Sequence, residues 1–247
     1  MVLNAAAYHF VSIADPEALA ARLEARAAAA DLLGSVLVAG EGVNLFLAGA
    51  ELELKGFFAA LQAEPGLETM RVKYSASRAR PFQRLKVRVK PEIIAFRRPS
   101  ASPLQRRAPA VAPATLARWL AQGSDDRGRA LTLLDTRNRE EVVHGSFAGA
   151  LALPIDNFTD LPAALEPHRE ALAATTVVSF CTGGVRCEKA ALWMGDSGME
   201  HVVQLDGGIL GYFEQVGDLG YEGNCFVFDQ RVALDPRLRP VVEPAEG

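Results

Sequence analysis

The sequence predicts an α/β chain in which a doubly wound parallel sheet is preceded by a smaller α+β domain of ferredoxin-like (acylphosphatase-like) topology. Two observations support this prediction. In the second half of the chain, short apolar runs alternate with helical patterns, an order typical of parallel strands joined by crossover helices. In the first half, the patterns follow the order strand, helix, strand, strand, helix, strand, with one further strand appended. This order is typical of ferredoxin-like domains.

The first domain is expected to span residues 1–98. Asp15 and Pro16 supply an N-cap and a first helical residue, and Gly34 ends that helix. Residues 40–42, Gly-Glu-Gly, predict a hairpin turn. We expect strands at 6–13, 35–39, 43–48, 67–74 and 85–96, and helices at 16–33 and 52–62.

Residues 99–113 predict a linker, because they are rich in Pro, Ser, Ala and Arg and show no periodicity. The second domain is expected at 114–220, followed by a tail at 221–247 whose Pro-rich end is expected to be mobile. Within the second domain we expect helices at 114–122, 186–194 and 209–216, and a mostly helical stretch at 160–173. We expect strands at 130–134, 151–154, 177–180 and 202–205.

Three chemically useful side chains directly follow predicted strands of the second domain: Asp135, Cys181 and Asp206. Ligands of doubly wound sheets bind beyond the carboxyl ends of the strands. The functional site is therefore expected at this edge of the sheet.

The loop at 181–186 has the composition of a thiolate site. Cys181 precedes a predicted helix, whose unpaired N–H groups and dipole favour the thiolate, the nucleophilic form of the side chain. Arg186 adds a permanent cation, and both glycines of the loop are expected to let the backbone curl around the sulfur with φ above zero. The alternative is that Cys181 is a buried small apolar residue. The backbone expected to hold an anion belongs to Thr182, Gly183, Gly184 and Val185.

Three further residues are candidates for an auxiliary or a structural role. Asp135 and Arg137 are expected to form a partly buried ion pair, although Arg137 facing the loop is the alternative. Cys187 is either a second thiol that resolves an oxidised or persulfidated Cys181, or a packed helix residue. Cys225 is too distant in sequence for a role to be assigned.

Composition bounds the class of protein. The chain has 247 residues, of which 49% are hydrophobic and 23% charged, as in a globular protein. No apolar stretch reaches membrane-spanning length, and residues 1–13 lack the features of a secretory leader. Three cysteines are too few for a disulfide framework, so we expect a cytoplasmic protein. Four scattered histidines show no ligand spacing, so we expect no metal site.

Charge is distributed unevenly. Residues 71–107 contain twelve Lys or Arg and one acid, which leaves the rest of the chain at −15 although the net charge is only −4. Within this segment cations alternate with apolar residues along one predicted strand, so they share one face. A solvated edge strand is the alternative, but we favour binding of RNA phosphates. The candidate RNA-binding residues are Arg78, Arg80, Arg84, Lys86, Arg88 and Lys90. Two nearby aromatic residues, Tyr74 and Phe82, are candidates for base stacking or, more simply, for core packing.

Several motifs resemble known families. A cysteine, four residues and an arginine form a loop that is similar to the active-site loop of the rhodanese superfamily, and residues 135–138 and 145–150 resemble two other rhodanese elements. The full string at 181–189, Cys-Thr-Gly-Gly-Val-Arg-Cys-Glu-Lys, resembles the bacterial family of rhodanese-domain tRNA uridine hydroxylases. Further matching motifs lie at 41–44, 81–87, 207–210 and 225–229, so the resemblance covers residues 7–232.

The resemblance implies oxygen-dependent hydroxylation of the tRNA wobble uridine (position 34) at C5, with Cys181 essential. It implies tRNA as partner and molecular oxygen as co-substrate, and no other cofactor is evident. Our hypothesis is that a thiolate or persulfide on Cys181 attacks C6 of the uracil ring. The alternatives are a sulfurtransferase carrying sulfane sulfur as a persulfide on Cys181, and a non-catalytic rhodanese binding module. The oligomeric state does not follow from the sequence.

Overall fold

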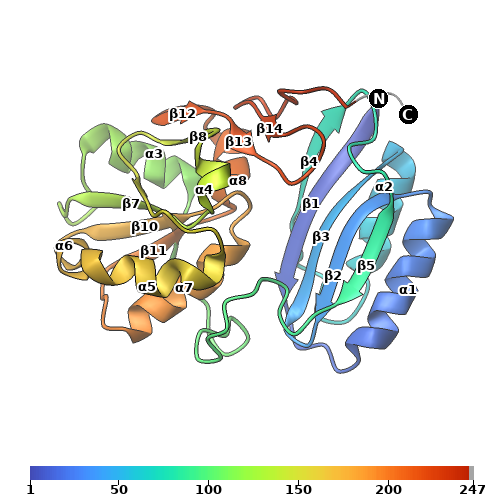
Figure 1. The fold of residues 1–247 in the computed structure, drawn as a ribbon, viewed down its shortest axis with the longest axis horizontal. Coiled ribbons are helices and arrows are strands. Elements are labelled where there is room, and N and C mark those ends of the chain that lie inside the picture. Colours follow the sequence, from blue (N-terminus) through green and yellow to red (C-terminus); the bar gives the residue numbers. More distant parts are fainter. Residues whose placement is uncertain (245–247) are drawn as a thin grey trace. The chain divides into compact units, whose positions relative to one another are not determined.

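The chain divides into two units, each with its own sheet (Figure 1). The structure is a computed structural model that describes residues 1–244. The first unit contains Met1–Ala95 together with Phe228–Val232 and the described residues from Arg239 onward. The second contains Phe96–Val227 and Ala233–Leu238. Each unit is described by itself below.

The first unit is built on a five-stranded sheet with the order β4-β1-β3-β2-β5. Strand β1 pairs antiparallel with β3 and β4, β2 pairs antiparallel with β3, and the appended strand β5 pairs parallel with β2. The two helices alternate with the strands in the predicted order. The elements are β1 (Val2–Phe10), α1 (Pro16–Ala29), β2 (Leu33–Ala39), β3 (Gly42–Gly49), α2 (Glu51–Leu61), β4 (Val72–Ser77) and β5 (Leu85–Val89).

Both helices pack on the same face of this sheet and create the core of the unit. Leu23 of α1 and Phe58 of α2 are fully or almost fully buried against Val43, Leu45 and Leu47 of β3. Helix α1 begins as predicted, because Asp15 accepts a hydrogen bond from the backbone N–H of Ala18 (2.8 Å). Neither α1 nor α2 covers the other face of the sheet, which carries the alternate residues of each strand.

Three strands of the first unit were predicted with wrong limits. Strand β1 spans Val2–Phe10 and not residues 6–13. Strand β4 begins at Val72 and not at residue 67, because the backbone from Leu67 to Met70 forms turns while both side chains enter the core. Strand β5 ends at Val89 and does not continue to residue 96. Pro91 lacks the N–H group that further pairing would need.

The second unit contains a five-stranded sheet with the order β6-β11-β10-β7-β9, in which every pairing is parallel. The predicted doubly wound sheet is therefore confirmed. Its strands are β6 (Ala110–Val111), β7 (Leu131–Asp135), β9 (Leu151–Ala152), β10 (Thr176–Phe180) and β11 (Val202–Leu205). The main helices are α3 (Pro113–Gln122), α7 (Val185–Asp196) and α8 (Gly208–Gln215), and a short helix α4 (Arg139–Val142) follows β7.

Residues 160–173 are mostly helical, as predicted, but they are divided into short pieces. The pieces are η1 (Phe158–Asp160), α5 (Leu161–Leu165), η2 (Glu166–His168) and α6 (Arg169–Ala173). Pro162 and Pro167 each stand in the first turn of one of these pieces. A proline within a longer helix would leave a carbonyl without its N–H partner, so the helix is interrupted.

The segments expected to be a linker and a tail are folded in part. Residues 110–111 of the expected linker form the edge strand β6. In the expected tail, β12 (Tyr221–Gly223) pairs with β8 (Gly145–Phe147), and β13 (Cys225–Phe226) pairs with β14 (Ala233–Leu234). The intervening segment belongs to the first unit. The last three residues of the tail, 245–247, lie outside the described residues.

Candidate active site

Strand β10 places Cys181 at the carboxyl edge of the second sheet. All five residues of β10 are buried, and the strand lies between β7 and β11 in the centre of the sheet. Phe180, the residue before the cysteine, pairs with Asp135 at the end of β7. The sheet therefore brings Cys181 and Asp135 to the same edge, as the strand ends predicted.

The loop after Cys181 curls around the sulfur through one glycine and not two. Gly184 has a φ of 106°, and its backbone N–H donates a hydrogen bond to Cys181 Sγ (3.1 Å). Gly183 does not have a positive φ, so the expectation that it would is wrong. Space around Gly183 is open, because an added Cβ would meet no atom within 4 Å outside its chain neighbours. Only Gly184 is required by the backbone conformation of the loop.

Gly208 is a further residue of the loop structure that the sequence analysis missed. It has a φ of +62°, and an added Cβ would lie 2.4 Å from Cys181 O and 2.7 Å from the Gly184 nitrogen. At the start of α8, Ile209 N–H and Leu210 N–H donate to the carbonyl oxygens of Cys181 (2.9 Å) and Thr182 (3.0 Å). Residues 207–208, Gly-Gly, which predicted the start of a helix, thus also let α8 approach the loop.

The surroundings of Cys181 favour its thiolate form. The side chain is completely buried, and burial alone raises a thiol pKa. Opposing contributions come from the Cys187 thiol, which donates a hydrogen bond, from the Arg186 charge, and from the backbone N–H groups of Arg186 and Gly184. Together they lower the pKa of Cys181 to about 5. The thiol predicted to be nucleophilic is therefore ionised at neutral pH.

Arg186 is held by a carboxylate that the sequence analysis did not identify. Both terminal guanidinium nitrogens of Arg186 contact Glu141 of α4, Nη2 at 2.7 Å from Oε2, and both side chains are buried. Thr182 Oγ1 donates to the same carboxylate (3.3 Å). Burial would raise the pKa of Glu141, but the hydrogen bonds and charge of Arg186 lower it below its usual value. Arg186 Nε has no hydrogen-bond partner in residues 1–244.

Glu141 is oriented by a local motif. Its Oε1 accepts from the backbone N–H of Asn138 (3.0 Å), and the Glu141 N–H donates to the backbone carbonyl of Asn138 (2.9 Å). The side-chain bond of Glu141 is the glutamate half of a capping box, Asn-x-x-Glu. That spacing, directly after a strand end, was the available signal for Glu141.

The predicted ion pair between Asp135 and Arg137 is present and fully buried. Arg137 Nε and Nη2 lie 2.9 and 2.6 Å from the two carboxylate oxygens of Asp135. Ser146 Oγ also donates to Asp135 (2.8 Å), and Arg137 Nη2 donates to Gly145 O (2.7 Å). These contacts tie the end of β7 to β8. They favour the structural interpretation of the pair over a role facing the loop.

The other two cysteines also lie near the loop. Cys187 is fully buried, with Sγ 3.5 Å from Thr136 Oγ1, and burial raises its pKa well above the usual value. Cys225 of β13 is fully buried, and burial raises its pKa to about 12 although its thiol is hydrogen-bonded with Thr182. All three thiols are free. Cys181 is therefore the one cysteine whose pKa is lowered.

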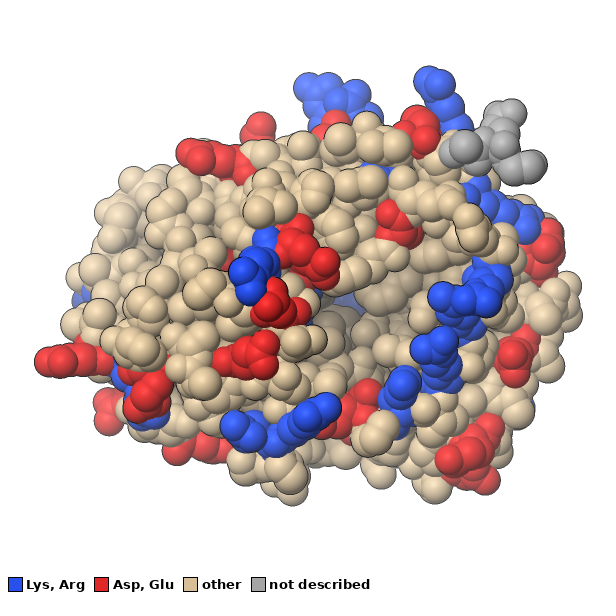
Figure 2. Space-filling model, in the orientation of Figure 1, with Lys and Arg blue, Asp and Glu red and all other residues tan. Residues whose placement is uncertain are grey.

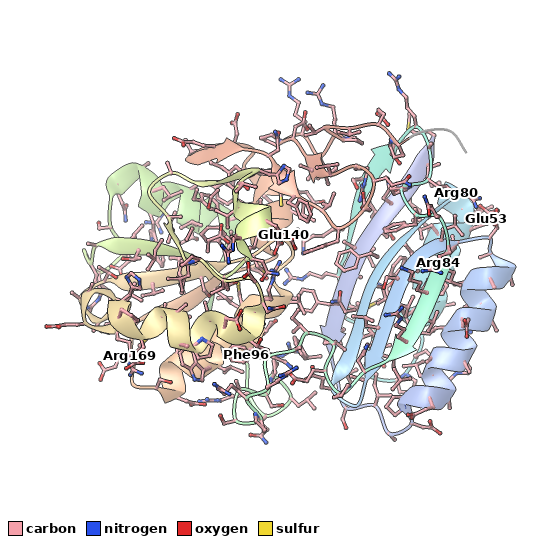
Figure 3. The ribbon with its side chains drawn as sticks, viewed as in Figure 1. Glu53, Arg80, Arg84, Phe96, Glu140 and Arg169 are labelled. Carbon is pink, nitrogen blue, oxygen red and sulfur yellow. The ribbon has the colours of Figure 1, made fainter. Side chains whose placement is uncertain are left out.

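The predicted RNA-binding residues belong to the first unit and fall into two groups. Along β5 the apolar residues Leu85 and Val87 pack against the core, and the alternating cations are exposed (Figure 2). These cations make no ion pair within residues 1–244; they are Arg84, Lys86, Arg88 and Lys90. We call them the β5 stripe, which starts at the Arg84 labelled in Figure 3.

Two of the predicted cations are engaged elsewhere. Arg80 forms an ion pair with Asp31, and Arg78 approaches Glu243 (3.9 Å). Tyr74, a candidate for base stacking, packs on the helix-covered face against Phe58, with ring centroids 6.5 Å apart. Core packing is therefore its role.

Within residues 1–244 no group of three or more His, Cys, Asp or Glu side chains is arranged to hold a metal ion. The helices of the described chain are all too short or too polar to cross a membrane.

Comparison with known proteins identifies both units. Residues 2–93 match the family model of the UPF0176 acylphosphatase-like domain, and residues 116–215 match that of the rhodanese-like domain. The NMR structure of a rhodanese-like domain from Anabaena is 24% identical, with a TM-score of 0.38 over 47% of this chain and 79% of that chain.

Relatives that carry both units match over almost the whole chain. A protein from Xanthomonas euvesicatoria pv. vesicatoria named tRNA uridine(34) hydroxylase is 65% identical over 243 residues, which are 98% of each chain. A protein of the same name from Xylella fastidiosa is 56% identical over 98% of this chain and 95% of the relative. With an acylphosphatase-like unit, a rhodanese unit and this degree of identity, the chain belongs to the tRNA uridine(34) hydroxylase family.

Proposed function

We propose that this protein hydroxylates C5 of the uridine at position 34 of tRNA, with Cys181 as the reactive thiolate. The observation that carries the proposal is the 65% identity to a tRNA uridine(34) hydroxylase over both units. The lowered pKa of Cys181 supports it, since uracil reacts with nucleophiles at C6 and a thiolate is a strong nucleophile. Three free thiols are consistent with a reducing, cytoplasmic compartment, where tRNA is found.

The proposed reaction begins when Cys181 Sγ forms a bond to C6 of the ring and the electron pair of the C5–C6 double bond moves onto C5 and O4. Molecular oxygen adds to C5 and takes one proton, which gives a C5 hydroperoxide. Two thiols reduce this group to a hydroxyl; they become one disulfide, and the second oxygen atom leaves as water. Loss of the C5 proton and departure of the thiolate then restore the double bond. One uridine, one oxygen molecule and two thiols thus give one 5-hydroxyuridine, one water and one disulfide.

Arg186 and Glu141 have positioning roles in this proposal. The Arg186 charge stabilises the Cys181 thiolate, and Glu141 fixes the guanidinium in a buried place where it retains its charge. Cys187 is hydrogen-bonded to Cys181 and supplies one of the two reducing thiols. A small-molecule thiol from solution is the second, and another molecule of it reduces the resulting mixed disulfide. The carbonyl groups of Cys181 and Thr182 already accept hydrogen bonds from α8, so these two oxygens are not available to a bound base.

The β5 stripe is the proposed contact for the tRNA backbone. Four exposed cations without a carboxylate partner in residues 1–244 suit a polyanion. A sulfurtransferase acting on thiosulfate has no use for such a stripe, so this alternative is less well supported. The variant Lys86→Glu/Arg88→Glu is expected to lose tRNA binding while the pKa of Cys181 stays low.

The test is hydroxylation of unmodified tRNA by the purified protein under ¹⁸O₂, followed by nucleoside mass spectrometry. We expect one ¹⁸O atom in 5-hydroxyuridine with the wild type and none with Cys181→Ala. Product formed equally well by Cys181→Ala would show that the thiol is dispensable. Product without ¹⁸O would show that the oxygen atom comes from water. Thiosulfate turnover by the same samples, with no hydroxylation, would favour the sulfurtransferase.

A further inference from the structure

The face of the first sheet that lies opposite α1 and α2, which we call the helix-free face, carries two neighbouring aromatic side chains. They are Phe46 of β3 and Tyr8 of β1, and we call them the aromatic floor. The register defines a row of side chains across all five strands, with Phe46 of β3 in its centre. Ala6 of β1 and Ser35 of β2 lie on either side of Phe46. Lys73 of β4 and Lys86 of β5 lie at the two ends of the row. Because both neighbours of Phe46 in the row have small side chains, they do not cover the edges of its ring.

A second row of the same face lies one pleat further along. It runs from Tyr8 of β1 through Asn44 and Leu37 to Arg88 of β5. Tyr8 is therefore the diagonal neighbour of Phe46, and both side chains are partly exposed. Neither belongs to the core beneath the helices, which uses the alternate residues of these strands.

Segments of the same unit cover the β4 margin of this face and one position of the central strand β3. On the β4 side, buried Arg231 donates to Ser75 Oγ (2.7 Å). In the second row, Asn44 of β3 lies directly between Tyr8 and Leu37 and is buried, and its Nδ2 donates to Ile93 O (3.3 Å). Phe46 and Tyr8 stay partly exposed beside these segments, and neither row contains an acidic residue.

We propose that this face binds unpaired nucleotides of the tRNA anticodon loop, with bases stacked on Phe46 and Tyr8 and phosphates held by Lys86 and Arg88. Aromatic side chains on an open sheet are how RNA-recognition motifs hold single-stranded RNA. Stacking requires a flat ring with one accessible face, and cations at the margin of the platform follow the backbone. The inference rests on the proposed function for the identity of the RNA, whereas the sheet register alone defines the binding surface.

Single-stranded RNA fits this surface better than a protein partner does. A protein interface of this kind would place apolar side chains over Phe46 and leave Lys86 and Arg88 to pair with acids at one margin only. An RNA loop uses rings and cations together, with alternating bases and phosphates. The cations of β5 point to the same face as Phe46, because Ser35 pairs with both Phe46 and Lys86.

The test is fluorescence anisotropy with an anticodon stem-loop RNA and the variants Phe46→Ala and Tyr8→Ala. We expect about tenfold weaker binding for each, with an unchanged dependence on salt. Phe46→Tyr and Tyr8→Phe should bind like the wild type, since the ring is retained. Lys86→Glu/Arg88→Glu should weaken binding and also reduce the salt dependence. Leu52→Ala, at a highly exposed residue of α2, is the matched control and should have no effect.

A second arm needs only the wild-type protein. Loop nucleotides are replaced one at a time by an abasic residue, and at the stacked positions affinity should fall about as much as with Phe46→Ala. Combining such an RNA with Phe46→Ala should add little further loss. Equal affinity for every abasic RNA would overturn the inference, as would undiminished binding by both alanine variants. A concentration-dependent dimer lost in Phe46→Ala, with RNA binding unchanged, would identify a second copy as the occupant and also overturn it.

The outcomes separate this inference from the proposed function. If Phe46→Ala and Tyr8→Ala hydroxylate tRNA with wild-type KM, the stacking surface is wrong and the proposed function stands. If the loop binds with the predicted pattern but the wild type yields no 5-hydroxyuridine, the surface stands and the proposed function is wrong.

Discussion

Three buried thiols near one loop differ in the direction of their pKa shifts. Burial raises the pKa of Cys187 and of Cys225, whereas the N–H groups, the Arg186 charge and the Cys187 thiol outweigh burial at Cys181. The Cys187 thiol keeps its proton and donates it in a hydrogen bond, so each of the two sulfurs reinforces the shift of the other. Only Cys181 is therefore a nucleophile at neutral pH.

The first prediction at this scale concerns alkylation of Cys181 by iodoacetamide. Its thiolate fraction rises through a midpoint near pH 5 and is complete above about pH 6 to 7, so the alkylation rate should be level between pH 7 and 9. An unperturbed thiol would still gain reactivity over that range. Peptide mass spectrometry of protein labelled at each pH separates the three cysteines. A Cys181 rate that climbs steadily to pH 9 would contradict the lowered pKa.

The second prediction concerns the buried pair of Glu141 and Arg186. Glu141→Gln leaves a buried guanidinium without its counter-charge, so we expect the free energy of unfolding to fall by about 3 kcal/mol. Arg186→Met alone should cost a similar amount, because Glu141 is then unpaired. The double variant Glu141→Gln/Arg186→Met should lose clearly less than the sum of the two. Urea unfolding of all four proteins checks this, and additive losses would mean that the pair contributes nothing as a pair.

At the scale of the element, the conformation of the turn from β10 into α7 requires glycine at two positions, one in the turn and one in α8, for two different physical reasons. Gly184 has a φ that side-chain-bearing residues rarely adopt, and Gly208 of α8 has no room for a Cβ against the loop backbone. Gly183 has neither constraint.

The third prediction follows from this difference. Gly184→Ala and Gly208→Ala should each lower the melting temperature and slow alkylation of Cys181 at pH 7, because the N–H of Gly184 moves away from the sulfur. Gly183→Ala should leave the melting temperature unchanged and serves as the matched control. Differential scanning fluorimetry and alkylation kinetics are the measurements. Equal effects at Gly183 and Gly184 would show that the loop conformation does not depend on φ at Gly184.

Elements with a long apolar pattern were predictable, and those defined by tertiary pairing were not. The buried apolar run of β10 and the N-cap of α1 are each indicated by a few consecutive residues, and both occur as predicted. Strands β6 and β13 have two residues each, so no periodicity can indicate them, and only their partner strands make them strands. Glu141 was missed for a related reason, because its partner Arg186 is 45 residues away in the sequence.

At the scale of the whole molecule, the chain returns to its first unit near its end. Phe228–Val232 belongs to that unit, although both flanking segments belong to the second. Arg231 is buried and forms two hydrogen bonds with Asp229, at 2.8 and 2.5 Å, besides its bond to Ser75 of β4. A tail was expected from residue 221 onward, but the buried ion pair of Arg231 and Asp229 holds this segment within the first unit.

The fourth prediction is that Arg231→Ala destabilises the first unit selectively. Asp229 would remain buried without its cation, at a cost of about 3 kcal/mol or more, and β4 would lose the contact to Ser75. Hydrogen exchange followed by mass spectrometry should therefore accelerate in β4 and β1 while β10 stays protected. Arg237→Ala, at an exposed arginine of the same region, is the control and should leave exchange unchanged.

Tryptophan fluorescence provides an independent check, because both tryptophans, Trp119 and Trp193, belong to the second unit. In Arg231→Ala, unfolding followed by far-ultraviolet circular dichroism should begin at a lower urea concentration than unfolding followed by fluorescence. Coincident and equally shifted curves would contradict selective destabilisation and would mean that the two units unfold as one. Since the β5 stripe and the aromatic floor are both parts of the first unit, the same variant should also weaken binding of the anticodon loop at urea concentrations where Cys181 still shows its low pKa. RNA binding and thiolate chemistry would then be separable within one chain, each following the stability of its own unit.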